Sequence, residues 1–193
     1  SEALPLAPEQ WQLVERTPTG EGQRLSFTWR ADQMTPLIRC APSAPQHCVL
    51  TGRAGDTLVY ARVTGDTVGP LHRITGVTGA IDVAADGKRL VAPYKDARVA
   101  AIDIDSGKVT VLASTGLPCT ARHARQDPDE PDRFWMVHLC ADRFAIGEIR
   151  AGGTYREVAA SDGWISGIEV LAGGELVYSA MDWDPQLQLL PGL

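Results

Sequence analysis

Apolar and polar residues alternate with a period of two along most of this chain, and no long helical period is present. In residues 24–30, for example, Leu25, Phe27 and Trp29 stand between polar neighbours. Alternation of this kind is typical of strands that bury one face. The alternating segments are 11–17, 24–30, 35–40, 48–52, 57–63, 71–75, 80–84, 89–94, 99–105, 108–112, 119–125, 134–140, 143–150, 155–159, 165–171, 175–180 and 186–190. The pattern predicts an all-β protein.

Turn dipeptides with glycine separate several of these segments. Asp-Gly at 86–87 and Ser-Gly at 106–107 lie between apolar runs and indicate hairpins, because glycine adopts the positive φ that tight hairpin turns need. With these two turns and the connection between residues 94 and 99, residues 80–112 contain four consecutive antiparallel strands. A four-stranded antiparallel sheet of this size is one blade of a β-propeller.

One phrase occurs twice, since residues 82–91 are echoed by 169–177. The turn glycines of the two copies, Gly87 and Gly174, are separated by roughly twice the propeller period of about 40–45 residues. The last strand group is one strand short, and the segment 11–17 is a candidate for the missing strand. We therefore predict a β-propeller of about four blades, closed by pairing of the N- and C-terminal strands, or a partial propeller.

Length and composition predict one globular domain. Residues 1–8 contain two prolines and are interpreted as a linker, and residues 9–193 as a single propeller-like domain. The chain is 44% hydrophobic with a formal net charge of −6, and its 18 basic residues are spread singly. We expect no nucleic-acid binding, which needs a basic stripe. There is no apolar run of about 18 residues, so we expect no membrane span in this chain.

The cysteines form two local pairs, Cys40 with Cys48 and Cys119 with Cys140, and no C-x-x-C motif occurs. An even number in two pairs favours two disulfides and an oxidising compartment, either the periplasm or the extracellular space. Buried free thiols are the alternative.

Two histidines accompany the second cysteine pair. Directly opposed Cys119 and Cys140 would place His123 and His138 on the same face of a hairpin, a ligand set that suits zinc. However, His123 would lie about 13 Å along its strand from Cys119, too far for one ion. We predict a disulfide and no metal site, with His138, Cys140 and Cys119 as the alternative metal ligands.

Catalytic signatures are absent from the sequence. There is no G-x-S-x-G elbow, phosphate-binding glycine loop or H-E-x-x-H motif. Propeller lactonases use an inward Glu, Asn and Asp metal set, and this chain has no asparagine. We therefore predict a protein that is not an enzyme and binds no cofactor.

Tryptophans and acidic turn residues supply the remaining candidates for binding. Most of the five tryptophans are expected to pack between blades, but Trp164 and Trp183 lie near turns. Together with Asp182 and Asp184 they are our candidates for contact with a partner. The acidic segment 127–132 is interpreted as a solvated connection between strands.

Several segments resemble TolB-like and WD-type propeller repeats. Residues 85–90, Ala-Asp-Gly-Lys-Arg-Leu, are similar to the repeat phrase of those families, and residues 101–108 to the turn before a blade's outer strand. Residues 37–50, with their paired cysteines, and 184–190 resemble parts of the extracytoplasmic propellers of bacterial winged-helix regulators and eukaryote-like serine/threonine kinases. The chain departs from the pattern in lacking a Trp-Asp signature and in having Gly173 where Asp is usual.

The resemblance implies a sensory or interaction domain outside the cytoplasm. We accordingly expect a non-enzymatic domain that binds a protein or small ligand for a membrane-anchored signalling protein. Two alternatives stay open: a propeller module of a hydrolase or peptidase, and a half-propeller that is completed by a second copy as a homodimer.

Overall fold

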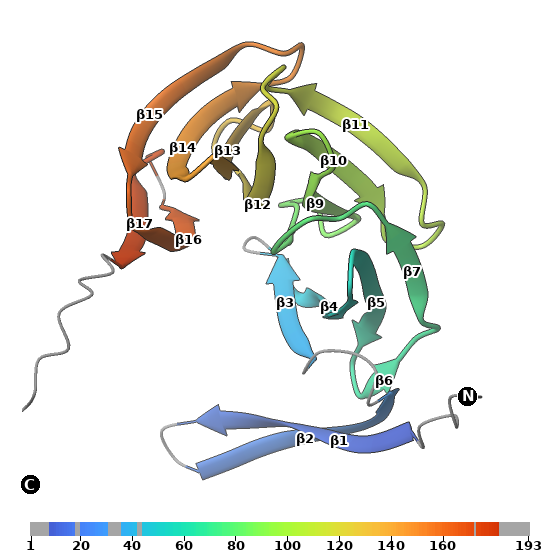
Figure 1. Ribbon diagram of the computed structural model, residues 1–193. Coiled ribbons are helices and arrows are strands. Elements are labelled where there is room, and N and C mark those ends of the chain that lie inside the picture. The colour runs from blue at the N-terminus through green and yellow to red at the C-terminus, as the bar shows by residue number, and fades with distance from the viewer. Residues whose placement is uncertain (1–7, 18–19, 31–35, 42–43, 172, 182–193) are drawn as a thin grey trace, which may run out of the picture.

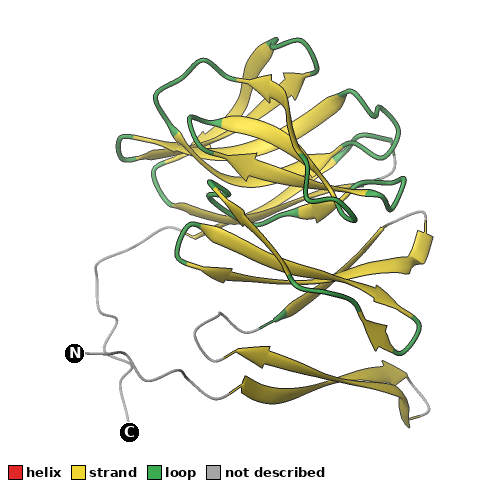
Figure 2. Ribbon diagram, turned by 90° about the vertical axis from the view of Figure 1, so that its right-hand side faces the viewer, coloured by secondary structure: helices red, strands yellow, loops and turns green. Residues whose placement is uncertain are grey.

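The computed structural model describes residues 8–17, 20–30, 36–41, 44–171 and 173–181, and these residues form strands and connecting turns (Figures 1 and 2). No helix with the length and hydropathy of a membrane span occurs among them. The described part of the chain is therefore all-β, as the alternating sequence predicts.

Three antiparallel sheets contain four or five strands each. Sheet 1 contains β3 (Leu37–Ala41), β4 (Ala44–Ala54), β5 (Thr57–Thr64), β6 (Thr67–Val68) and β7 (His72–Thr75). Sheet 2 contains β8 (Asp82–Val83), β9 (Arg89–Tyr94), β10 (Arg98–Asp103) and β11 (Val109–Ser114). Sheet 3 contains β12 (Thr120–Gln126), β13 (Arg133–Cys140), β14 (Arg143–Arg150) and β15 (Tyr155–Ser161). Figure 1 shows the three sheets following one another around a curve, as propeller blades do.

Two further hairpins lie at the ends of this curve. β1 (Pro8–Thr17) pairs with β2 (Gly20–Arg30), and β16 (Trp164–Val170) pairs with β17 (Leu176–Met181). In the described residues no strand pair joins the two hairpins, and Figure 1 shows them apart. Of the two alternatives, the closed one, in which segment 11–17 completes the last sheet, is therefore not formed among the described residues. The candidate strand 186–190 lies outside the described residues, and the number of blades stays a prediction.

The core lies between neighbouring sheets, which explains why the central strands are buried on both faces. In β9, Leu90 belongs to a buried cluster with Tyr60 of sheet 1, whereas the next residue, Val91, belongs to a second buried cluster with Phe134 of sheet 3. Successive strand residues point to opposite faces, so a blade between two others presents apolar side chains to both. Sheet 3 packs in the same way on β16 through Ile165 and its neighbours.

The two glycines of the repeated phrase occupy equivalent places. Each lies in the turn between the first two strands of its sheet, Gly87 with φ of 64° and Gly174 with φ of 75°. A Cβ on Gly87 would lie 2.2 Å from Nδ1 of His47, and a Cβ on Gly174 would lie 2.4 Å from Nη2 of Arg133. Both contacts are with the second strand of the preceding sheet. The repeated sequence therefore marks the turns in which one sheet contacts the sheet before it.

Both expected disulfides are present. Cys40 pairs directly with Cys48 across β3 and β4, and Cys119 is bonded to Cys140 just before β12 and at the end of β13. Each bond links the first two strands of its own sheet. No free cysteine remains in the chain.

Candidate functional site

A pocket of about 550 Å³ lies where β3, the segment before β8 and the beginning of β16 come together. We call it the central pocket. Leu37, Leu58, Ile81 and Trp164 supply its apolar lining. Trp164 is 44% exposed, and its ring lies 5.5 Å from that of Phe144. A cavity with an apolar lining and a few polar groups is the usual form of a small-molecule site.

The segment before β8 is fixed against the first strand of sheet 3. Ala80 donates its backbone N–H to the carbonyl of Arg122 at 2.8 Å, and Thr78 donates its hydroxyl to the carbonyl of Ala121 at 2.6 Å. Gly79 is required there, because a Cβ at this position would lie 1.6 Å from the same Arg122 carbonyl oxygen. This close approach brings Arg122 beside the wall of the central pocket.

Arginines supply the polar part of the site. Arg39 and Arg53 line the pocket, and Arg53 donates from Nη2 to the carbonyls of Gly55 and Val77, both at 3.0 Å. The Nε atoms of Arg53 and Arg122 are buried without a hydrogen-bond partner. Buried polar groups are nearly always hydrogen-bonded, so these donors mark a place that an acceptor would satisfy.

The positive charges act on one another. Burial lowers the pKa of Arg53, and the neighbouring charge of Arg122 lowers it further against a weaker opposite effect from Asp56. No carboxylate of the described part of the chain forms an ion pair with Arg39, Arg53 or Arg122. The site is thus locally cationic in a protein whose net charge is −6.

The pKa of His123 responds to the same group of positive charges. Burial lowers its pKa to about 4, and the charges of Arg125, Arg39 and Arg122 contribute in the same direction. The imidazole is therefore neutral near pH 7. A β-bulge between Ala121 and His123 changes the alternation of β12, which separates His123 from the cysteine pair.

Arg125 joins the first strands of sheets 2 and 3 to β16. Its guanidinium donates to the carbonyls of Ile81 at 3.1 Å and Ile168 at 3.2 Å, and to a carboxylate oxygen of Glu169 at 3.2 Å. Asp82 lies 3.9 Å away. Burial raises the pKa of Asp82, while Arg125 opposes this rise. Arg125 is itself 7% exposed and satisfies acceptors that would otherwise be buried unpaired.

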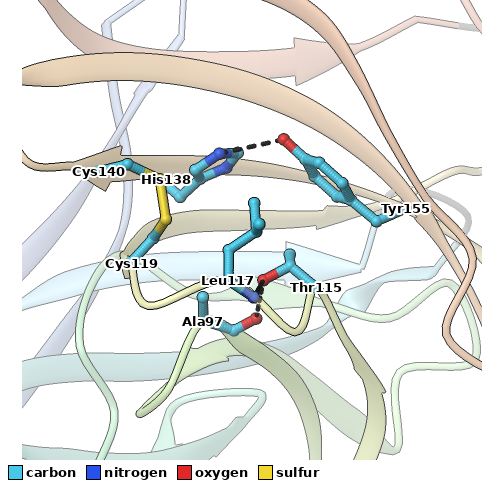
Figure 3. Close-up of a disulfide and its surroundings, with 7 residues drawn as sticks. All are labelled: Ala97, Thr115, Leu117, Cys119, His138, Cys140 and Tyr155. Atoms are coloured by element: carbon cyan, nitrogen blue, oxygen red, sulfur yellow. Dashed lines mark hydrogen bonds between the residues drawn. A yellow bond between two sulfur atoms is a disulfide. The ribbon is translucent and has the colours of Figure 1, made fainter.

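The sequence-based candidates fall in different places. Trp164 lines the central pocket, whereas Trp183, Asp182 and Asp184 lie outside the described residues. His138 lies beside the Cys119–Cys140 disulfide, so those cysteines and His138 do form a cluster, without His123 (Figure 3).

Sequence reasoning missed the role of Asp127. The segment 127–132, interpreted as solvated, holds Asp127 at 1% exposure. Its carboxylate accepts hydrogen bonds from Arg133 at 2.6 and 2.9 Å and from Nε1 of Trp135 at 3.3 Å. Backbone N–H groups of Asp129 and Glu130 donate to its other oxygen at 2.9 and 3.1 Å. The sequence feature that could have indicated this network is Asp127 followed by Arg133 and Trp135 on the next strand.

Comparison with known proteins identifies the fold. No protein-family model matches the chain, and no curated protein sequence matches it. A solved structure from Bacteroides uniformis ATCC 8492, provisionally named a 6-phosphogluconolactonase, is 12% identical with a TM-score of 0.50, over 88% of this chain and 57% of that one. A second, from Bacteroides fragilis NCTC 9343 and named in the same way, is 17% identical with a TM-score of 0.45, over 78% and 54%. The chain therefore spans about half the length of the structures that it matches.

This comparison corrects one sequence-based prediction. The absence of catalytic motifs led us to expect a protein that is not an enzyme, but the Bacteroides uniformis neighbour has a name that denotes an enzyme. At these identities the likeness establishes the fold alone.

Proposed function

We propose that this chain binds a small organic anion with an apolar body in the central pocket. The observation that carries the proposal is that two arginines, Arg39 and Arg53, line the pocket, and that the Nε of Arg53 is a buried donor without a partner. Arg122, whose backbone contacts the pocket wall at Gly79, has a second buried Nε without a partner. Charge-assisted hydrogen bonds to a carboxylate, sulfonate or phosphate are the strong interactions that guanidinium groups make. The lining by Leu37 and Trp164 suits the remainder of the ligand.

The binding role fits an extracytoplasmic sensory or interaction domain. The two disulfides support an oxidising compartment, the periplasm or the extracellular space. The resemblance to TolB-like and WD-type repeats supports a link to a membrane-anchored signalling protein. In this proposal the bound anion is the signal that the domain detects. The central pocket lies between sheet 1, the segment before β8 and β16, so its occupancy would stabilise their arrangement.

Isothermal titration calorimetry with matched ligands tests the binding. Naphthalene-2-sulfonate carries a charge that persists from pH 4 to 8, and naphthalene-2-sulfonamide is its neutral counterpart. We expect the sulfonate to bind and the sulfonamide to bind far more weakly. Arg53→Gln should weaken sulfonate binding by about 10- to 100-fold, since a hydrogen bond to a charged group contributes about 1.5–3 kcal/mol.

Arg73→Gln is the matched control, because Arg73 is an exposed arginine on β7 outside the pocket. It should leave the affinity unchanged. Equal binding of both ligands, or equal effects of the two substitutions, would contradict the proposal. A phosphorylated sugar lactone, the ligand class to which the names of the fold neighbours refer, belongs in the same titration with proton release as the readout for turnover.

A further inference from the structure

Three metal-ligating side chains meet at the end of sheet 3, away from the central pocket. The sulfurs of Cys119 and Cys140 and one imidazole nitrogen of His138 lie within 4.8 Å of one another. In the described residues this is the one cluster of three potential metal ligands. In this structure the two sulfurs form a disulfide. A disulfide has no thiolate, so it offers no metal ligand in this state.

His138 is held beside the sulfurs with one nitrogen unsatisfied. The side chain is 1% exposed, and its Nδ1 is buried without a hydrogen-bond partner. Nε2 lies 3.1 Å from the hydroxyl of Tyr155 (Figure 3). Gly147 leaves room for the Tyr155 ring, because a Cβ at this position would lie 2.1 Å from the ring. The tyrosine hydroxyl thus contacts Nε2 and leaves Nδ1 as the imidazole nitrogen without a partner.

The loop 115–117 covers the cluster from sheet 2. Thr115 donates its hydroxyl to the carbonyl of Ala97 at 3.3 Å and accepts the N–H of Leu117 at 3.1 Å (Figure 3). Leu117 and Cys140 are both packed against the same apolar cluster. Cys119 is 9% exposed, whereas Cys140 is half-buried.

We propose that the Cys119–Cys140 disulfide is the oxidised form of a zinc site whose ligands are Cys119, Cys140 and His138. A dithiol reductant supplies two electrons and two protons. The protein S–S bond breaks, two protein thiols form, and the dithiol is oxidised to its own disulfide. On binding Zn²⁺ the two thiols lose their protons, and His138 binds through the unprotonated nitrogen.

The positions suit tetrahedral zinc. With Zn–S distances of about 2.3 Å the two sulfurs must lie about 3.8 Å apart, so each moves by about 1 Å from its bonded position. Two thiolates and one imidazole leave the fourth position to water, the arrangement of zinc sites that keep an open position. The contact between Tyr155 and His138 is the outer partner that zinc-binding histidines usually have.

Cobalt(II) provides the readout, since thiolate ligands give an intense charge-transfer band in the near ultraviolet and tetrahedral geometry gives visible bands. The experiment uses the full chain with Cys40→Ser and Cys48→Ser, so that only the proposed cysteine pair remains. The protein is reduced with a phosphine, which binds the metal weakly, and titrated with Co²⁺ and then Zn²⁺. We expect one Co²⁺ per chain, displaced by one Zn²⁺, and no binding before reduction.

Two variants in this background separate the site from nonspecific thiol binding. His138→Gln should weaken Co²⁺ binding by at least 10-fold and change the visible bands, and Cys119→Ser should abolish the one-to-one complex. Circular dichroism reports whether each chain is folded. Absence of the charge-transfer band overturns the proposal whether the reduced protein is folded or not. An equal band in the His138→Gln variant overturns it as well, because thiolates alone would then bind the metal.

Discussion

Replacing Asp127 with asparagine is expected to lower the free energy of unfolding by about 3 kcal/mol, because one buried carboxylate accepts bonds from two side chains and two backbone N–H groups. Asparagine keeps the shape but has one acceptor oxygen and no charge. The amide group would face the guanidinium of Arg133, which then keeps Glu130 as its carboxylate partner. Urea unfolding followed by tryptophan fluorescence measures the change.

Asp132→Asn is the matched control, since Asp132 belongs to the same turn but is exposed and lies 4.0 Å from Arg150. We expect a change below about 1 kcal/mol for this surface pair. Comparable losses in the two variants would show that the buried network contributes little.

The same network predicts a pH dependence. Burial alone would raise the pKa of Asp127, but hydrogen bonds from Arg133, Asp129 and Trp135 outweigh it and hold the pKa below its usual range. A carboxyl with a lowered folded-state pKa stabilises the protein above its unfolded pKa of about 3.9 and loses this effect as the pH falls through the folded value. The difference between wild type and Asp127→Asn should therefore be constant at pH 5–7 and shrink below about pH 4.

Arg125→Met is expected to cost about 3–5 kcal/mol of stability, the usual result of removing one partner of a buried charged network. The substitution leaves the carbonyls of Ile81 and Ile168 without their donor and Asp82 without its cation. These acceptors belong to sheet 2 and β16, so the loss should also loosen the contact between sheets. Hydrogen exchange in β8 and β16 should accelerate in this variant more than exchange in β4 and β5.

Arg156→Met is the comparison for Arg125→Met. Arg156 is 71% exposed in its side chain and pairs with Glu148, which retains Arg150. We expect less than about 1 kcal/mol, because Arg156 is exposed and the buried Glu148 keeps its ion pair with Arg150. A similarly small effect for Arg125→Met would contradict the view that it joins three strands.

The strands themselves could be predicted from sequence, because alternation and glycine turns are local properties. The segments 89–94 and 143–150 match β9 and β14 to the residue. The pairing of the strands was harder to predict, since alternation shows that a segment is a strand but does not identify its partner. Segment 11–17 accordingly forms a hairpin with β2, whereas the sequence had made it only a candidate for the missing strand of the last sheet.

The candidate site depends on contacts that sequence spacing does not contain. Three separate strands, β3, β4 and β12, contribute Arg39, Arg53 and Arg122. No run of basic residues in this acidic sequence predicts that they lie near one another. The position of His123 depends on a bulge that inserts one residue in β12. The cysteine pairs were accessible, because each joins adjacent strands of one sheet.

The central claim is that an anion binds among the arginines, and the titration of His123 by NMR tests it most directly. Burial and then the arginine charges hold its pKa at about 4 in the free protein. An anion at this place offsets the positive charges, so naphthalene-2-sulfonate at saturation should raise the His123 pKa, and its affinity should increase as the pH falls from 7 to 5. A His123 pKa that is the same with and without the bound sulfonate would contradict the account.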